Sequence, residues 1–334
     1  MKILHLLLGA LTCFTLASCY EEDALTPTEG GVELRFNVPQ GSNSWDDYFA
    51  EIYDDYSVYF IYKNLQDEDY NRSWVNSGGL TGDGYQGSGC LNDEMAKFYE
   101  DFLRRHIFAY INSGITQKVL PIYWYLSYNV HTETTIEPIP GWVFTSYVPA
   151  NEITDGLDFW STCMFGEDNP SEPYLIPTDQ SIFSQRRKMI LGEILSQAVK
   201  KKNIAIPEDF SYGLDYKTKL VNSIGEEENA NYHLTRAFPG SVRLGKFILD
   251  EISNNSTPPS EENTFIGYIL QAMYFSEAES SVQYPAEKYP LLTKKFTLVR
   301  KYLKEKYKID LNAIAEGPQD WDIPLPSYNE MEEE

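Results

Sequence analysis

Histidine is scarce in this sequence, with 4 residues among 334, and one of them, His5, lies in the apolar N-terminal segment. Serine and cysteine hydrolases and most zinc enzymes use histidine as a base or as a ligand. The remaining three, His106, His131 and His233, are widely separated along the chain. So few histidines support neither a Ser-His-Asp nor a Cys-His catalytic arrangement.

Each of these three histidines has a structural interpretation. His106 lies on the apolar face of a predicted helix, so we expect a hydrogen-bonded core residue. His131 and Glu133 share one face of a predicted strand and could contact a metal weakly, although a solvent-facing pair is the preferred interpretation. His233 lies in an asparagine-rich loop with no acid at a ligand spacing.

Cysteine is equally scarce, and none of the 4 residues belongs to a CxxC motif or lies near a histidine at a ligand spacing. A metal or catalytic role is therefore not indicated. Cys13 belongs to the N-terminal apolar segment, and Cys19 directly follows it. Cys90 and Cys163 remain as an even pair, which can form a disulfide in an exported protein. Two separate buried thiols are the alternative, and the sequence does not choose between them.

Positive charge is low: 27 Lys and Arg stand against 50 Asp and Glu, for a net charge of -23. Such a field repels phosphate, which excludes nucleic acid as a partner and disfavours docking to anionic lipid headgroups. Apolar residues make up 42% of the chain and aromatic residues 14%, which is typical of a globular protein. The length suffices for one large or two modest domains.

No apolar run is long enough to span a bilayer, which takes roughly 20 residues. The longest follows Met1-Lys2 and ends in Leu16-Ala17-Ser18-Cys19, small residues leading into a thiol. This pattern predicts a signal peptide over residues 1–18, cleaved before a cysteine that accepts lipid. An ordinary secretory signal with a chance cysteine is the alternative. Residues 19–31, with Glu21, Glu22 and Asp23, are predicted to be a lipidated acidic tether.

Hydrophobic periodicity predicts an α+β fold, strand-rich to about residue 180 and helical after it. Strands are expected at 32–38, 57–62, 119–130 and 141–148. Helices are expected at 46–51 (a short turn), 95–111, 182–202, 264–279 and 292–307. Residues 77–90, which are rich in glycine, are predicted to be a loop, and 317–334 an acidic tail. We expect residues 32–316 to form the main domain.

Several short segments carry a family resemblance. They are Trp45-Asp46-Asp47-Tyr48, Tyr56-Ser57-Val58-Tyr59, Asp101-Phe102-Leu103, Ile206-Pro207-Glu208-Asp209-Phe210, Val299 to Lys304 and Ile309-Asp310-Leu311. In order and spacing the chain resembles the zinc-binding metallohydrolase lipoproteins of Bacteroidota, gluzincin-like proteins associated with nutrient-import loci. The resemblance implies a zincin-like helical part. It also implies that the acidic residues after Cys19 are an export signal for the outer face of the outer membrane.

The resemblance implies an HExxH motif on the central helix, where two histidines bind zinc and the glutamate is the general base. The matching pentad here is Gly192-Glu193-Ile194-Leu195-Ser196, in which only the glutamate is kept. The position of the third, carboxylate ligand falls on Gly267. By this alignment the protein has no metal ligands and no cofactor, and Glu193 has no zinc-bound water to activate. The small Gly192 and Ser196 would instead let a neighbouring element approach closely.

These inferences predict a lipid-anchored protein on the outer membrane, facing the cell exterior. The resemblance implies a non-catalytic accessory of a TonB-dependent nutrient importer, in contact with the transporter and its lid lipoprotein and binding or handing over peptide or glycan. Trp124, Trp142 and Trp160 could line a binding cleft, although core packing is the simpler expectation for each. A surface hydrolase with a rearranged site and a purely structural spacer are the alternatives.

Overall fold

The computed structural model describes residues 34–72, 84–169, 172–174, 180–223, 225–240, 243–244, 247–248 and 252–319. The predicted signal peptide, Cys19, the acidic tether to residue 31 and the tail after residue 319 lie outside these residues. The chain divides into two units, Met1–Asn37 and Val38–Glu334. The elements below all belong to the second unit.

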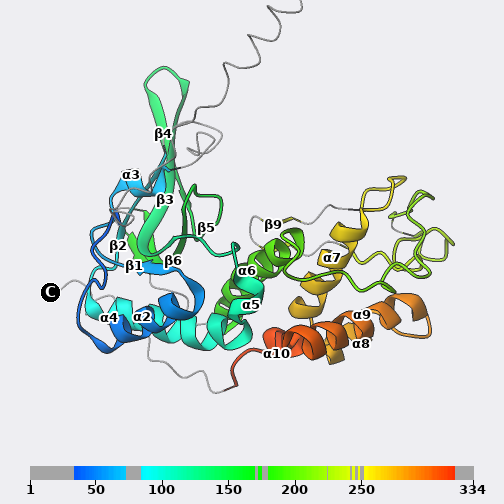
Figure 1. The fold of residues 1–334 in the computed structure, drawn as a ribbon. Helices are drawn as coiled ribbons and strands as arrows, with labels where there is room; N and C mark the ends of the chain where they lie inside the picture. The colour runs from blue at the N-terminus through cyan, green and yellow to red at the C-terminus, as the bar shows by residue number, and fades with distance from the viewer. Residues whose placement is uncertain are drawn as a thin grey trace, which may run out of the picture. The chain divides into compact units, whose positions relative to one another are not determined.

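One mixed sheet forms the N-terminal half of this unit (Figure 1). Its strands are β1 (Tyr59–Ile61), β2 (Tyr85–Gly89), β3 (Tyr123–Ile139), β4 (Trp142–Pro149), β5 (Glu152–Ile153), β6 (Phe159–Asn169) and β7 (Glu172–Tyr174). The first part of β3 lies between β1 and β6, parallel to both, while β2 and β4 run antiparallel to its second part. β5 and β7 pair antiparallel with β6.

Two sequence predictions about strands are wrong. Residues 34–38 form bends rather than part of a strand, because none of the described strands pairs with them and a strand requires a hydrogen-bonded neighbour. Tyr85–Gly89 was expected within a loop and forms β2. Its glycines serve close packing: a Cβ at Gly87 would lie 2.7 Å from Val130 Cγ2, and one at Gly89 would collide with the Tyr62 carbonyl oxygen.

Helices dominate after residue 180, so the α+β prediction is confirmed. The described helices are α2 (Ser44–Tyr56), α3 (Asp67–Tyr70), α4 (Asp93–Phe102), α5 (Ser113–Thr116), α6 (Gln180–Lys200), α7 (Glu261–Tyr274), α8 (Glu277–Gln283), α9 (Pro290–Tyr302) and α10 (Leu311–Glu316). α4 continues into a π-helical turn (Leu103–Ile107) and a 3-10 turn (Phe108–Tyr110), and α9 into a π-helical turn (Leu303–Tyr307). The short strands β8 (Arg243–Leu244) and β9 (Phe247–Ile248) pair with each other. None of the helices in the described part of the chain has the length and apolarity that a membrane crossing requires.

The helix predicted at 264–279 is two helices, α7 and α8. Ser276 begins α8 with a capping box: its hydroxyl accepts from the Glu279 amide (3.2 Å), and its own amide donates to Glu279 Oε2 (2.7 Å). A cap of this kind satisfies the backbone amides at the start of a helix, so a new helix begins at this point. The apolar periodicity continues across the break and gives no sign of it.

A single hydrophobic core cluster joins the sheet to the helices. Trp124 of β3 and Met164 of β6 belong to the same cluster as Leu191 of α6, Phe265 of α7 and Val299 of α9. The strand-rich and helical parts therefore share one apolar interior, and α6 is the helix through which they meet. The candidate site residues Gly192 to Ser196 lie on this helix.

Candidate functional site

The pentad Gly192 to Ser196 lies in the middle of α6, where that helix packs against α7. Gly192 is buried, and Ser196 is 1% exposed with a hydroxyl that makes no hydrogen bond with the described residues. Glu193 is half-buried, and its Oε1 accepts from Gln197 Nε2 one turn later (2.9 Å). The carboxylate is thus engaged within its own helix.

Gly267, at the position of the third ligand, is buried in α7 between the core residues Ile266 and Tyr268. A glycine offers no side-chain donor to a metal. Among the described residues no group of three or more His, Cys, Asp or Glu is arranged to hold a metal ion. The positions to which the family resemblance assigns the ligands are thus small, buried residues.

The histidines have structural partners. His106 is buried, stacks on Phe102 with ring centroids 5.0 Å apart, and accepts at Nδ1 from Arg187 Nη1 (3.0 Å). Burial, together with the Arg187 charge, lowers the pKa of His106 to about 3, so the ring is neutral in the folded protein. The expectation of a hydrogen-bonded core residue is confirmed.

His131 and Glu133 form the expected pair on β3, with Nε2 and Oε1 3.5 Å apart, and the His131 Nδ1 donates to the Asn129 carbonyl (2.8 Å). His233 is buried rather than loop-exposed, and its Nδ1 donates to the Phe238 carbonyl (2.8 Å). Burial lowers the pKa of His233. Each ring is therefore held by a backbone oxygen.

The tryptophans do not gather around a cleft. Trp124 and Trp160 are buried neighbours on β3 and β6, packed edge to face with ring centroids 5.4 Å apart. Trp142 lies on β4 and is exposed to solvent. Core packing, the simpler expectation, holds for the first two, and Trp142 belongs to a different surface.

The sheet separates Cys90 from Cys163, which favours two separate thiols, one of the two alternatives that the sequence leaves open. Both residues are free thiols. Cys90 directly follows β2 and Cys163 lies in β6, with β3 between these strands, where Ser127 pairs with both Gly89 and Cys163. Two strand spacings separate the Cα atoms by about 9–10 Å, whereas a disulfide needs less than about 7 Å.

We expect both thiols to react with an alkylating reagent once the protein is unfolded without prior reduction. In the native protein we expect slow labelling, because Cys163 is buried and burial raises the pKa of the Cys90 thiol, which keeps it protonated. Mass spectrometry of the chain lacking residues 1–19 measures this directly. A bridged peptide containing Cys90 and Cys163 would contradict the strand order.

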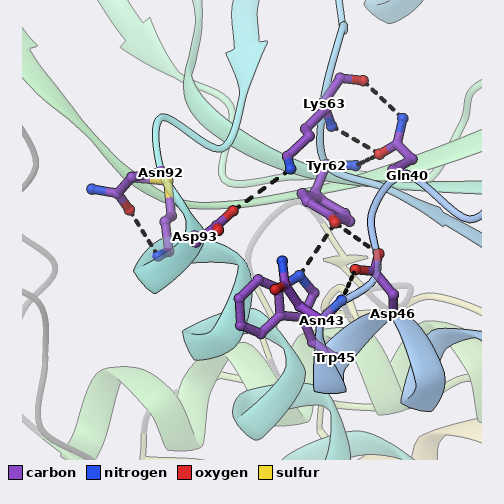
Figure 2. A network of polar contacts seen from close by, with 9 residues as sticks. Gln40, Asn43, Trp45, Asp46, Tyr62, Lys63, Asn92 and Asp93 are labelled. Carbon is purple, nitrogen blue, oxygen red and sulfur yellow. Dashed lines mark hydrogen bonds and ion pairs between the residues drawn. The ribbon is translucent and has the colours of Figure 1, made fainter. Parts of the chain in front are cut away.

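The Trp45-Asp46 motif is part of a polar network between the start of α2 and the end of β1 (Figure 2). Asp46 is buried and accepts from the Tyr62 hydroxyl (2.7 Å) and from the Asn43 amide (2.9 Å). The Trp45 indole donates to the same Tyr62 hydroxyl (3.2 Å). Burial, and then the bond to Asp46, raise the pKa of Tyr62. These hydrogen bonds join the start of α2 to the residue that follows β1, so the motif has a structural role.

Three of the other segments that carried the family resemblance contain core or capping residues. Phe102 and Leu103 are fully buried, and the Phe210 ring packs edge to face on Phe265 at 5.0 Å. Asp310 caps α10, because its side chain accepts from two backbone amides of the first turn. Core and cap residues specify a fold and say nothing about a reaction.

Arg187 of α6 is a buried cation that the sequence analysis did not single out. Its guanidinium donates to the Ile314 carbonyl (2.9 Å), to the Ala315 carbonyl (3.4 Å) and to Ser184 Oγ (3.1 Å), besides His106. The two carbonyls belong to the end of α10, where backbone oxygens favour a positive charge. The sequence contains a signal of this burial, because Arg187 lies on the same helix face as the apolar Ile190, Leu191 and Ile194.

Glu152 of β5 is the second buried charge that sequence reasoning missed. Its Oε2 accepts from Thr162 Oγ1 (2.7 Å), which in turn accepts from Trp124 Nε1 (2.9 Å). Oε1 lies 3.8 Å from Arg186 Nη1. Burial raises the pKa of Glu152 to about 8, and Arg186 and Thr162 only partly oppose this. The side chain is 7% exposed, so the carboxyl is shielded from a substrate.

A cleft of about 330 Å³ lies between α8, α9, the turn that follows α9, and the start of α10. Its lining contains cations and anions in similar number: Arg300, Lys301, Lys304, Glu277, Glu305 and Asp310, with Thr297 and Asn312. Lys304 is paired with Asp310 (2.6 Å), and the partly buried Arg300 donates to the Phe275 carbonyl (3.0 Å). The cleft can therefore receive a ligand that carries both signs of charge.

Comparison with known proteins gives one distant likeness. No protein-family profile matches the chain, and no curated protein matches it. A solved structure described as a "putative zinc-binding metallo-peptidase" from Bacteroides caccae is similar, with a TM-score of 0.39 and 14% sequence identity, covering 83% of this chain and 92% of that one. A likeness at this level carries no conclusion about activity. The function proposed below rests on the residues of this chain.

Proposed function

We propose that the protein is a lipid-anchored, non-catalytic accessory of a TonB-dependent importer, facing the cell exterior and binding or handing over its nutrient. The proposal that the protein is not a catalyst is supported by the side chains of the pentad Gly192 to Ser196 on α6 and of Gly267 on α7. Gly192 and Gly267 have no ligating side chain, and Ser196 is buried. Glu193, bonded to Gln197, would be a lone carboxylate.

The lipid anchor is supported by the small residues before Cys19, and the exterior location by Glu21, Glu22 and Asp23 behind it. The contact with a transporter and its lid lipoprotein is supported by the family resemblance of the signature segments. Because the protein is acidic, with a net charge of -23, a basic surface on the partner would favour association.

The cleft beside α9 favours a peptide over a neutral glycan as the nutrient. A peptide carries an ammonium and a carboxylate group, and the cleft presents Arg300 and Lys301 together with Glu277 and Glu305. A glycan without charged groups would form no ion pairs with these side chains, of which Lys301 and Glu305 pair with each other at 3.9 Å. Titration calorimetry with short peptides and with neutral oligosaccharides distinguishes the two classes.

Dialysed protein is expected to hold far less than one zinc per chain. A protein zinc site needs three or four ligands in fixed geometry, and apparent binding energies of about 10–16 kcal/mol depend on that full set. Elemental analysis measures the metal content, and a peptidase screen with and without chelator measures activity. Near one zinc per chain together with chelator-sensitive activity would favour the surface hydrolase instead.

Changing Cys19 to alanine is expected to remove the protein from the membrane fraction and to abolish palmitate labelling. Changing Glu21, Glu22 and Asp23 to alanine is expected to keep lipidation but to leave the protein on the periplasmic side, where proteinase K added to intact cells does not reach it. Membrane partition of the unlipidated variant would contradict the anchor, and unchanged protease sensitivity would contradict the export signal.

Co-purification from outer membranes addresses the partner. An accessory that delivers nutrient should co-purify with a TonB-dependent transporter and should also bind ligand by itself. A protein that co-purifies but binds neither peptide nor glycan would be a structural spacer. Absence of the transporter from the purified complex would contradict the proposal.

A further inference from the structure

The hairpin of β3 and β4 carries apolar side chains that no described part of the chain covers. Among the described strands, only β4 pairs with β3 beyond residue 132, so the hairpin extends past the other described strands of the sheet (Figure 1). Five large apolar side chains on it are between 52% and 63% exposed: Ile136, Ile139, Trp142, Phe144 and Val148.

The strand register places these five side chains on one face. Ile136 is opposite Phe144, and Ile139 is opposite Trp142. Residues that face each other across an antiparallel pair share a face, and residues two apart on one strand do so as well. The Trp142 and Phe144 ring centroids are 6.4 Å apart. Val148 continues the same face along β4.

The opposite face of the hairpin is more polar. It carries Thr135 opposite Thr145, with hydroxyls 3.1 Å apart, and Glu133 opposite Tyr147. Val143 is the large apolar side chain there, 61% exposed. The hairpin is thus amphipathic, with its more apolar side turned to solvent.

Charge is nearly absent from this hairpin. Residues 134–149 contain a single charged side chain, Glu137, although 23% of the whole chain is charged. The Glu137 carboxylate accepts from the Gly141 amide in the turn (2.6 Å). Transfer of this face from water into an apolar phase would therefore desolvate almost no charged group, and its cost in free energy would be low.

The exposed apolar face is comparable with the largest apolar patch of a typical monomer, which measures about 300–600 Å². Five such side chains, half or more exposed, present about 500 Å². Patches of this size are often functional, and larger ones mark protein or membrane contacts. A two-stranded ribbon has open edges, which are not tolerated in the hydrocarbon interior, so a membrane contact would be confined to the interfacial layer.

We propose that the apolar face of the β3–β4 hairpin lies on a lipid bilayer, with Trp142 and Phe144 in the interfacial layer. This inference rests on the lipid anchor of the proposed function. Only 14 residues lie between Cys19 and Leu34, and this stretch spans at most about 50 Å. The anchor would make the hairpin contact intramolecular, so a contact that is weak in solution suffices to orient the domain.

A lipid surface fits this face better than a second copy of the chain. Two copies would bring together two net charges of -23, and like charges oppose association. The same charge disfavours anionic lipids, so the hairpin should prefer a zwitterionic bilayer. Tryptophan suits this location, because its ring is amphipathic and collects at membrane interfaces.

The test uses the chain from Tyr20 onward, which keeps every described residue but lacks the lipid. Flotation with phosphatidylcholine vesicles over a lipid titration gives its partition coefficient. The double variant Trp142→Ser, Phe144→Ser is expected to lower this coefficient at least tenfold. Val143→Ser, on the opposite face of the same hairpin, is the matched control and should change it less than twofold. Val282→Ser on α8, at an exposed site 82% accessible, should have no effect.

Absence of vesicle binding by the unsubstituted chain, or equal binding by the double variant, would overturn the inference. Sedimentation in the absence of lipid provides a second criterion: a dimer that Phe144→Ser dissociates would assign the face to a second copy. Circular dichroism confirms that the variants are folded. Because the assay contains neither Cys19 nor an importer, its outcome is separate from the tests of anchoring and of transporter contact.

Discussion

Replacing Arg187 by methionine is expected to lower the free energy of unfolding by about 3–5 kcal/mol. The substitution fills much of the same volume but removes every donor. It leaves the Ile314 and Ala315 carbonyls and His106 Nδ1 without the partner that they have in the folded protein. A buried polar group that loses its partner costs about 1–3 kcal/mol. Urea unfolding followed by circular dichroism measures the change.

Lys301→Met is the control. Lys301 is exposed and pairs with the equally exposed Glu305 one helical turn away (3.9 Å), and a surface pair of this kind contributes less than about 1 kcal/mol. Arg187→Lys keeps the charge but has fewer donors in a different geometry, so an intermediate loss is expected. If Arg187→Met unfolds at the same urea concentration as Lys301→Met, the buried network does not stabilise the protein.

Glu152→Gln is expected to make the protein more stable than the unsubstituted chain at pH 9 and to reduce this difference as the pH falls. Burial raises the folded-state pKa of Glu152 to about 8 from its ordinary 4.5. Between these values the folded protein keeps a proton that the unfolded chain has released, so a rise in pH favours unfolding. The loss approaches about 1.4 kcal/mol per pH unit inside this window.

Comparing Glu152→Gln with the unsubstituted chain separates the effect of Glu152 on the pH dependence of stability from that of His106, which has the opposite sign. The lowered pKa of His106 makes stability fall as the pH drops from about 6.5 towards 3. This contribution is common to both proteins and cancels in their difference. Unfolding free energies at pH 5, 7 and 9 provide the measurement. Parallel curves for Glu152→Gln and the unsubstituted chain would show that the carboxyl titrates normally.

Much of the helical half could be predicted from the sequence, because helix periodicity is local. The apolar residues of α6 and α9 repeat every three to four positions, and both helices lie close to where the pattern predicts them. The division between α7 and α8 was missed, since it depends on the cap at Ser276 and not on apolar spacing. Capping side chains interrupt a helix without changing its hydrophobic pattern.

The strands were predicted less well, because pairing joins residues that are far apart. β2 resembles a glycine-rich loop, and only its neighbours Val130 and Tyr62 explain why glycine is needed at Gly87 and Gly89. The sequence could not choose between a disulfide and two separate thiols for the same reason. Two cysteines 73 positions apart can be bridged or separate, and the strand between them decides the matter.

By itself the sequence determined the α+β class and the scarcity of histidine, since these follow from residue identity and local spacing. Tertiary structure alone decided that Arg187 and Glu152 are buried and that the β3–β4 hairpin exposes an apolar face. Burial and strand register depend on contacts between distant segments, so the chain order alone does not reveal them.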